Sequence, residues 1–181
     1  MKRVVSTALA LAAGALTVAA PLAAQRASVV EPNQFAIDGS LGFSVPTQSG
    51  LSTGIDVMGA FEWKPGSLGL PLWFRGEIGY SNWGISNVNE SLGAWRFLAD
   101  AVLPFHVPAS PLIPYAIAGL GIYHQSCCGF SSTGFGLNFG GGVRYPIAGI
   151  EPYFELRYHA IFDKSESDFL PFQFGVRFKL P

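Results

Sequence analysis

The sequence predicts an all-β fold, namely an eight-stranded antiparallel up-and-down transmembrane β-barrel. Nearly half of the chain is hydrophobic (49%) and only 13% is charged, yet beyond the N-terminus no segment approaches the ~20 unbroken apolar residues of a membrane helix. The apolar residues instead alternate with polar ones in eight runs, as the strands of membrane barrels do. The last run, residues 173–180, alternates strictly and carries two full positive charges on its polar face. In a lipid-facing barrel, that polar face turns toward the lumen.

The N-terminus predicts export. Lys2 and Arg3 precede an Ala-rich apolar run that ends in a small-residue cleavage site at Ala24, which is the organisation of a secretory signal peptide. A membrane anchor is the alternative, but the run is barely long enough to cross a bilayer. We therefore expect a signal peptide over residues 1–24 and one outer-membrane barrel domain over residues 25–181, the latter of about 157 residues.

Charge and cysteine usage narrow the function classes. Without the two N-terminal cations the mature chain has a net formal charge of about −3, which is too weak to predict a nucleic-acid partner. The two cysteines are adjacent, so they cannot build a long-range disulfide framework.

The first four runs each set apolar residues opposite charged ones. They cover residues 35–45, 53–64, 71–81 and 94–103. Their polar faces hold Asp38, Asp56, Glu62, Lys64, Arg75, Glu77, Arg96 and Asp100. The expected connections are a polar loop over 47–52, a tight turn at Pro65-Gly66-Ser67, a loop over 82–91 and a Pro-rich link over 104–111.

The last four runs cover residues 114–124, 133–145, 151–162 and 173–180. In the fifth run both parities are apolar, so its facing stays open. In the sixth, Asn138, Arg144 and four glycines share the inward face, as expected where bulky neighbours share a narrow lumen. The polar faces of the seventh and eighth hold Glu155, Arg157, His159, Gln173, Arg177 and Lys179.

The connections alternate in character. Those after runs two and six are short turns, whereas those after runs one, three, five (125–132) and seven (163–168) are longer and polar, as in barrels with short periplasmic turns and longer outer loops. An even strand number lets the first strand pair with the last. Because an eight-stranded barrel is only wide enough to be filled by side chains, we expect the inward charges to form a plug of ion pairs.

Aromatic residues near the run ends predict girdles at the two membrane interfaces. They are Trp63, Trp73, Tyr80, Trp83, Trp95, Tyr115, Tyr123, Tyr145 and Tyr158. The alternative is that aromatics simply favour strands. For the whole chain the alternative is a soluble periplasmic lipocalin-like ligand-binding barrel, which would place the charges outside and large aromatics such as Phe61 and Phe97 inside.

The final run resembles the C-terminal recognition signal of bacterial outer-membrane β-barrels. Gln173, Gly175, Phe178 and Leu180 match that signal, although Pro181 follows where such chains usually stop on an aromatic. The mature chain as a whole resembles the small barrels of the outer membrane protein A transmembrane domain and outer membrane protein X type. This resemblance implies a location in the cell outer membrane of a diderm bacterium. It also implies contact with outer-membrane lipids including lipopolysaccharide, and insertion by the barrel-assembly machinery through the C-terminal strand.

We expect a monomer with a structural or surface-interaction role and a charge-filled, non-conducting lumen, with no cofactor and no enzymatic activity. The alternative is a lipid-modifying hydrolase, because His124 and Ser126 lie two residues apart on one strand face and outer-membrane lipid A deacylases use such a pair with a carboxylate. Here the next strand offers Asn138 but no acid, and Glu151 and Glu155 lie one run further on. The triad is incomplete, so no residue is predicted to be catalytic.

Cys127 and Cys128 are left with three states: a vicinal disulfide, a covalent link to another chain, or two unpaired thiols. No metal site is predicted, because only His124 lies nearby and structural sites want four ligands. His106 is expected to be a turn residue and His159 a hydrogen-bonding residue of the lumen.

Overall fold

The computed structural model describes residues 32–86, 90–162 and 168–181. The expected signal peptide, residues 1–24, lies outside the described residues. The barrel is formed by Asn33–Pro65 and Pro71–Pro181, whereas Gly66–Leu70 belong to a second unit that contains the 3-10 helix η1 (Gly66–Leu68). This helical turn occupies the place of the tight turn predicted after Pro65. None of the described helices is long and apolar enough to cross a bilayer.

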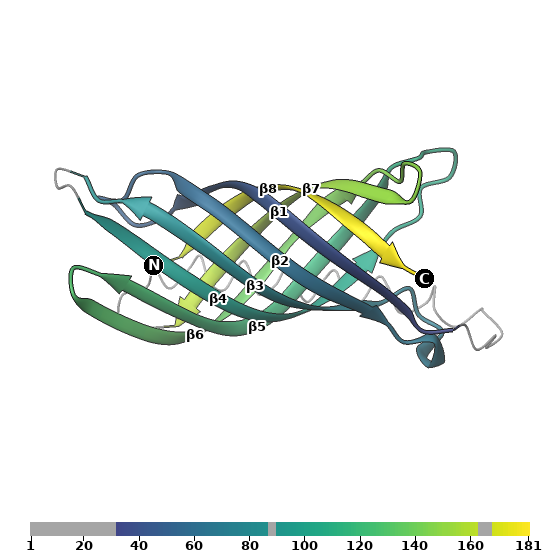
Figure 1. Cartoon of the computed structure of the whole chain (residues 1–181), viewed down its shortest axis with the longest axis horizontal. Coiled ribbons are helices and arrows are strands. Elements are labelled where there is room, and N and C mark those ends of the chain that lie inside the picture. Colours follow the sequence, from purple (N-terminus) through teal and green to yellow (C-terminus); the bar gives the residue numbers. More distant parts are fainter. Residues whose placement is uncertain (1–31, 87–89, 163–167) are drawn as a thin grey trace, which may run out of the picture. The chain divides into compact units, whose positions relative to one another are not determined.

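Eight antiparallel strands form a closed barrel in which spatial order follows chain order (Figure 1). They are β1 (Gln34–Pro46), β2 (Gly54–Lys64), β3 (Trp73–Gly84), β4 (Ser91–Pro104), β5 (Ile113–Cys127), β6 (Phe130–Arg144), β7 (Ile150–Phe162) and β8 (Phe169–Leu180). The predicted fold class is confirmed.

The first and last strands close the barrel. Phe35 of β1 lies opposite Leu180 of β8, so both strand termini meet at one end of the barrel, here called the terminal end. The opposite end, where β1, β3, β5 and β7 finish and β2, β4, β6 and β8 begin, is the loop end. Closure gives the backbone groups of β1 and β8 partners, which a lipid environment could not supply.

The faces of the strands follow the period of two. On β8, the side chains of Phe174 and Phe178 are exposed (55% and 45%), whereas Gln173 and Arg177 are buried. The other strands repeat this arrangement, with large apolar residues outside and charges inside. The lipocalin-like alternative is therefore excluded, because a soluble barrel needs the reverse polarity.

The facing of the fifth run, which the sequence left open, is now clear. Tyr115, Ile117 and Tyr123 are buried in the interior, and Leu120 and Ile122 are exposed on the outer wall. Both parities of β5 are apolar because its inward residues pack among other apolar side chains at the two ends of the lumen.

The prediction of a long loop over residues 125–132 is wrong. β5 and β6 continue as a paired ribbon to Cys127 and Phe130, leaving only Cys128 and Gly129 in the turn. Both turn residues have positive φ angles (56° and 78°), as a two-residue hairpin turn matching the strand twist requires. The polar residues taken for a loop keep strand pairing, with Gln125 opposite Ser132.

Two other connections were also predicted to be loops. The loop predicted over 82–91 is shorter, because β3 runs on to Gly84 and β4 begins at Ser91. Of the loop expected over 163–168, all but Asp168 lies outside the described residues. The backbone carbonyl of Asp168 accepts hydrogen bonds from the backbone N–H and hydroxyl of Thr47, which ties the start of β8 to the β1–β2 connection.

The girdle prediction is wrong for four of the nine aromatic residues. Trp73, Trp83, Tyr115 and Tyr123 are buried inside the barrel. Trp63, Trp95 and Tyr145 are exposed on the outer face, and Tyr80 and Tyr158 are half-buried. Aromatic residues near strand ends therefore serve two purposes here, since some face outward and others fill the lumen.

Inward glycines make room for the large lumen side chains, as predicted. A Cβ atom added at Gly142 would lie 2.4 Å from the hydroxyl oxygen of Tyr115, and one at Gly175 would lie 2.3 Å from the ring of Tyr153. Both tyrosines are buried. A side chain at either glycine would therefore occupy the space that a tyrosine fills.

Candidate functional site

The described part of the interior concentrates charged side chains. Seven carboxylates and five guanidinium groups are buried there: Asp38, Asp56, Glu62, Glu77, Asp100, Glu151 and Glu155, and Arg75, Arg96, Arg144, Arg157 and Arg177. The set includes every acid assigned to the inner face from the sequence and five of the seven bases. The two lysines differ, because the side chain of Lys179 is 55% exposed and Lys64 is half-buried at the terminal end.

Salt bridges join these groups into one path of alternating sign along the interior. From the terminal end the path runs through Lys179, Glu151, Arg177, Glu62, Arg75, Glu155, Arg157, Glu77, Arg96 and Asp56, with N···O distances of 2.6–2.9 Å. Each carboxylate before the final Asp56 lies between two cations. Burial of so many ions is tolerable only because each one finds an opposite charge and hydrogen bonds.

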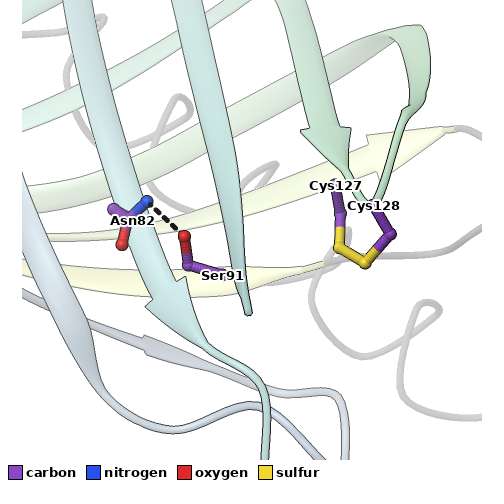
Figure 2. The surroundings of a disulfide bond; sticks show 4 residues. All are labelled: Asn82, Ser91, Cys127 and Cys128. Atoms are coloured by element: carbon purple, nitrogen blue, oxygen red, sulfur yellow. Dashed lines mark hydrogen bonds between the residues drawn. A yellow bond between two sulfur atoms is a disulfide. The ribbon is translucent and has the colours of Figure 1, made fainter. Parts of the chain in front are cut away.

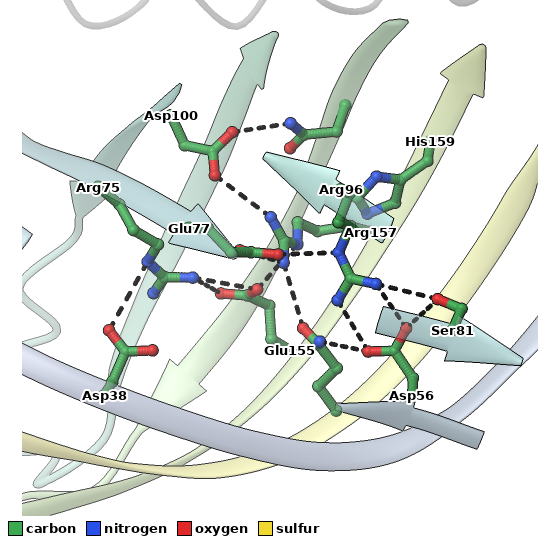
Figure 3. A network of polar contacts seen from close by, with 12 residues as sticks. Asp38, Asp56, Arg75, Glu77, Ser81, Arg96, Asp100, Glu155, Arg157 and His159 are labelled. Atoms are coloured by element: carbon green, nitrogen blue, oxygen red, sulfur yellow. Dashed lines mark hydrogen bonds and ion pairs between the residues drawn. The ribbon is translucent and has the colours of Figure 1, made fainter. Parts of the chain in front are cut away.

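Arg157 of β7 is a branching point of this path (Figure 3). Its guanidinium group lies 2.6 Å from Glu77 and 2.9 Å from Glu155, and it donates a 3.3 Å hydrogen bond to Asp100. Asp100 also accepts a 2.7 Å hydrogen bond from Asn138. Arg157 thereby links β3 and β4 directly to β7, and Asp100 extends this connection to β6.

Arg96 of β4 makes the second such centre. It pairs with Glu77 through Nε and with both oxygens of Asp56 through its two terminal nitrogens. Asp56 also accepts hydrogen bonds from Ser81 (2.5 Å) and Gln173 (2.6 Å). Because a guanidinium fork and a carboxylate match in geometry, this pairing fixes the orientation of both groups.

Apolar residues close the loop end of the interior. The cluster consists of Trp83, Ala94, Leu98, Tyr123, Ile161 and Phe169. His159 lies beneath it, stacked on Phe169 with ring centroids 4.6 Å apart, and a 2.8 Å hydrogen bond joins its Nδ1 to the Tyr123 hydroxyl. The role expected for His159, a hydrogen-bonding residue of the lumen, agrees with this contact.

A second apolar cluster lies at the terminal end. It consists of Ala36, Trp73, Val102, Tyr115 and Ile117. The guanidinium groups of Arg177 and Arg144 lie over the rings of Trp73 and Tyr115, 4.2 and 4.5 Å from the ring centroids. These cation–π contacts join the apolar cluster to the charged path. Apart from the exposed Lys179 at the terminal end, the ion pairs thus lie between apolar side chains at both ends.

The His124 and Ser126 pair lies on the opposite side of the wall from these ions. Both residues are exposed on the outer face of β5, and the Nδ1 of His124 is hydrogen-bonded to the Thr133 hydroxyl at 2.8 Å. The carboxylates weighed as partners, Glu151 and Glu155, are buried in the interior. The structure therefore does not assemble the triad considered from the sequence.

The cysteines form a vicinal disulfide at the tip of the β5–β6 hairpin (Figure 2). Of the three states left open by the sequence, this is the one present. Cys128 is exposed and Cys127 half-buried. His106, in the link between β4 and β5, is exposed as expected of a turn residue.

One member of the interior was missed by the sequence analysis. Glu151 is the second residue of β7 and is buried between Arg177 and Lys179, at 2.7 Å from each. It has the same parity as Glu155 and Arg157, so the period of two could have placed it inside. Its position at the very start of the run hid that parity.

A closed barrel with an apolar exterior and an ion-paired interior defines the class: a small eight-stranded β-barrel of the outer-membrane type. No family model and no curated protein matches the sequence. Solved structures do match the fold. Neisserial surface protein A superposes with a TM-score of 0.69 at 20% identity, over 83% of this chain and 100% of that chain.

Two further structures agree. A major outer membrane protein of Thermus thermophilus gives a TM-score of 0.59 at 14% identity, over 83% of this chain and all of that one. Ail, the attachment invasion locus protein of Yersinia pestis, gives 0.54 at 12% identity with the same coverages. At these identities the likeness establishes the fold, and the resemblance predicted from the C-terminal strand is confirmed at that level.

Proposed function

We propose that the protein is an integral outer-membrane barrel with a structural or surface-interaction role, whose lumen does not conduct ions. The observation that carries the proposal is the enclosed path of salt bridges within an apolar wall. The wall suits a bilayer, because its outward residues are large and apolar and its backbone is paired around the whole circumference.

The interior supports a closed lumen. An ion crossing it would have to part groups held at 2.6–2.9 Å by opposite charges on several strands and pass the apolar clusters at both ends. Eight strands leave little room beyond their own side chains. Any role then lies on the surfaces that the barrel presents, and chiefly on the connections and hairpins at its loop end.

Planar-bilayer recordings test the closed lumen. The purified protein should give no steady conductance, whereas the double variant Glu77→Ala and Arg157→Ala, which removes two plug side chains of opposite charge, should raise the current. A neutral outward control is Ile78→Ala on the same strand as Glu77, which should leave the recording unchanged. A stable large current from the unaltered protein would contradict the proposal.

We also propose how the protein reaches the outer membrane and in which state it resides there. We infer that the segment 1–24 is removed after Ala24, that the barrel-assembly machinery reads the C-terminal strand, and that the mature protein is a monomer among outer-membrane lipids including lipopolysaccharide. Fractionation should recover it with outer membranes, and unheated samples should migrate faster on gels than boiled ones. Recovery as a soluble periplasmic protein without detergent would contradict this.

The proposal includes no catalytic role. The exposed pair of His124 and Ser126 is the feature that would favour a lipid hydrolase, but the hydrogen bond of His124 goes to Thr133 and the weighed carboxylates lie across the wall. Binding measurements against lipopolysaccharide and host matrix components, with the intact barrel, are the direct way to identify a surface partner.

A further inference from the structure

Three potential metal ligands meet at the loop end, outside the ion-paired interior. The carboxylate of Glu90 and the Sγ atoms of Cys127 and Cys128 all lie within 4.8 Å of one another. Glu90 and Cys128 are exposed and Cys127 is half-buried, so a solute can reach the group. In the sequence His124 is the neighbouring ligand type of the cysteines, whereas Glu90 lies 37 residues before Cys127 and is not recognisable as a neighbour.

The hairpin turn places the two sulfur atoms together. Cys127 is the last residue of β5 and pairs with Phe130, and Cys128 takes the first of the two positive-φ turn positions. Adjacent residues at a tight turn cannot move far apart. Breaking the sulfur–sulfur bond would therefore leave two thiols still close to each other at the tip.

Backbone pairing places Glu90 beside them. β4 pairs with β5, and Gly93 of β4 lies opposite Ser126. Glu90 directly precedes β4, and its carbonyl accepts a 3.0 Å hydrogen bond from the Ile85 backbone N–H. Asn82 donates a 3.3 Å hydrogen bond to the Ser91 hydroxyl, which further ties the end of β3 to the start of β4 (Figure 2).

We propose that Glu90, Cys127 and Cys128 form a redox-gated binding site for a thiophilic divalent cation such as Zn²⁺ or Cd²⁺. Two thiols, which are oxidised to a disulfide, or one phosphine, which is oxidised to its oxide, supply two electrons. The sulfur–sulfur bond of the protein breaks, and the two protons released from the thiols or from water complete the two protein thiols. With a phosphine, water provides the oxygen of the phosphine oxide. Binding of the cation then displaces the two thiol protons, so that two thiolates and one carboxylate face one dication.

The ligand types set the selectivity. Thiolates favour zinc and cadmium, whereas Mg²⁺ and Ca²⁺ require six or more oxygen ligands, and only one carboxylate is present here. Three protein ligands leave a fourth tetrahedral position open to water. In the disulfide form the sulfur atoms carry no negative charge, so the site is closed to metal until it is reduced.

Cadmium titration of the intact barrel in detergent micelles tests the site. The protein is reduced with a phosphine, the reductant is removed without air, and Cd²⁺ binding is followed by the thiolate-to-cadmium absorption band in the ultraviolet. The reduced protein should bind one Cd²⁺ per chain, Zn²⁺ should displace it, and a large excess of Mg²⁺ should not. The oxidised protein should show no such band.

Variants separate the ligands from their surroundings. Glu90→Gln should weaken binding at least about tenfold, a loss that even groups outside the ligand set can cause, and Cys128→Ser should abolish it. Ser126→Ala is the matched control beside Cys127, and His124→Ala tests the nearby imidazole; both should leave the affinity unchanged. Equal binding by oxidised and reduced protein, no binding by reduced protein, or full affinity in Glu90→Gln would overturn the proposal.

Discussion

The inner and outer faces of the barrel wall are built from the same strands but differ in how specifically each side chain is paired. Outward residues share one property, apolarity, and pack against other apolar residues, as Phe43 and Phe172 do with ring centroids 4.9 Å apart. Inward residues are specified pair by pair, as Arg177 is by Glu62 and Glu151 at 2.6 and 2.7 Å. Exchange of one apolar residue for another should be tolerated on the outer face. On the inner face, each charged residue needs its particular partner, so exchanges should be tolerated less.

The largest expected effect is the loss of a branching ion inside. Arg157→Ala should lower the free energy of unfolding by about 3–5 kcal/mol, because it leaves buried carboxylates without their cation. Asp100 is affected most, because within the described residues the salt bridge of its carboxylate is to Arg157. Its outward neighbour provides the control: Leu156→Ala removes only lipid-facing surface and should cost far less. Urea titrations of folded barrel by gel mobility measure both, and equal losses would refute the distinction between the faces.

A charge placed on the outer face should have the next largest effect. Phe178→Lys exposes an ammonium group to lipid, which costs up to about 2–4 kcal/mol at the bilayer midplane and less near the interface. Phe178 is also one of the apolar positions of the proposed recognition signal, so Phe178→Lys should in addition reduce the efficiency of insertion in cells. The measurement is the amount of heat-modifiable protein in isolated outer membranes.

Arg177→Gln is the inward comparison on the same strand. It should insert far better than Phe178→Lys, because Glu62 keeps Arg75 and Arg144, and Glu151 keeps Lys179. Arg177→Gln should instead lower the free energy of unfolding, because the contacts of Arg177 with both carboxylates are lost. If both variants inserted equally and near normally, the assigned facing of β8 would be wrong.

A smaller loss of stability is expected when a methyl group is added to a glycine on the inner face. A Cβ atom at Gly79, on the inner face of β3, would lie 2.4 Å from the Arg96 guanidinium carbon, and Arg96 is held by Asp56 and Glu77. Gly79→Ala should therefore cost about 1–3 kcal/mol, as overpacking of an interior usually does. At Gly76, on the outer face of the same strand, nothing lies within 4 Å of the added atom. Gly76→Ala should be nearly neutral, and a loss as large as that of Gly79→Ala would contradict the packing argument.

Much of the fold could be predicted from the sequence, because the period of two is a local property that each strand shows by itself. Charges such as Asp56 and Arg96 have strongly apolar neighbours on both sides, so their inward direction was evident. What failed were features that depend on partners in space. The polar residues 131 and 132 have the composition of a loop, but they pair across the hairpin with Ser126 and Gln125.

The candidate sites were less predictable for the same reason. Aromatic residues suit both an interface and a packed lumen, and composition alone does not separate the buried Trp83 from the exposed Trp95. Glu90 lies far from the cysteines in sequence and reaches them only because β4 and β5 are neighbours. The direction of a side chain follows from its own run, whereas its partners follow from register, which a single sequence does not reveal.

The smallest expected effect concerns the exposed pair on the outer face of β5. Ser126→Ala and His124→Ala should each change the free energy of unfolding by no more than about 0.5 kcal/mol, since surface residues outside special features contribute little. Neither should alter the acylation pattern of lipid A in cells producing the protein, because the interior carboxylates cannot reach across the wall to complete a triad. Mass spectrometry of lipid A from cells with the unaltered protein, with each variant and with no protein checks this. Deacylated lipid A that appears with the unaltered protein and disappears with Ser126→Ala would establish the hydrolase instead, with a carboxylate drawn from another source. An unchanged pattern in all four samples is the expected result, which would leave the two outer residues as parts of a solvated hairpin surface.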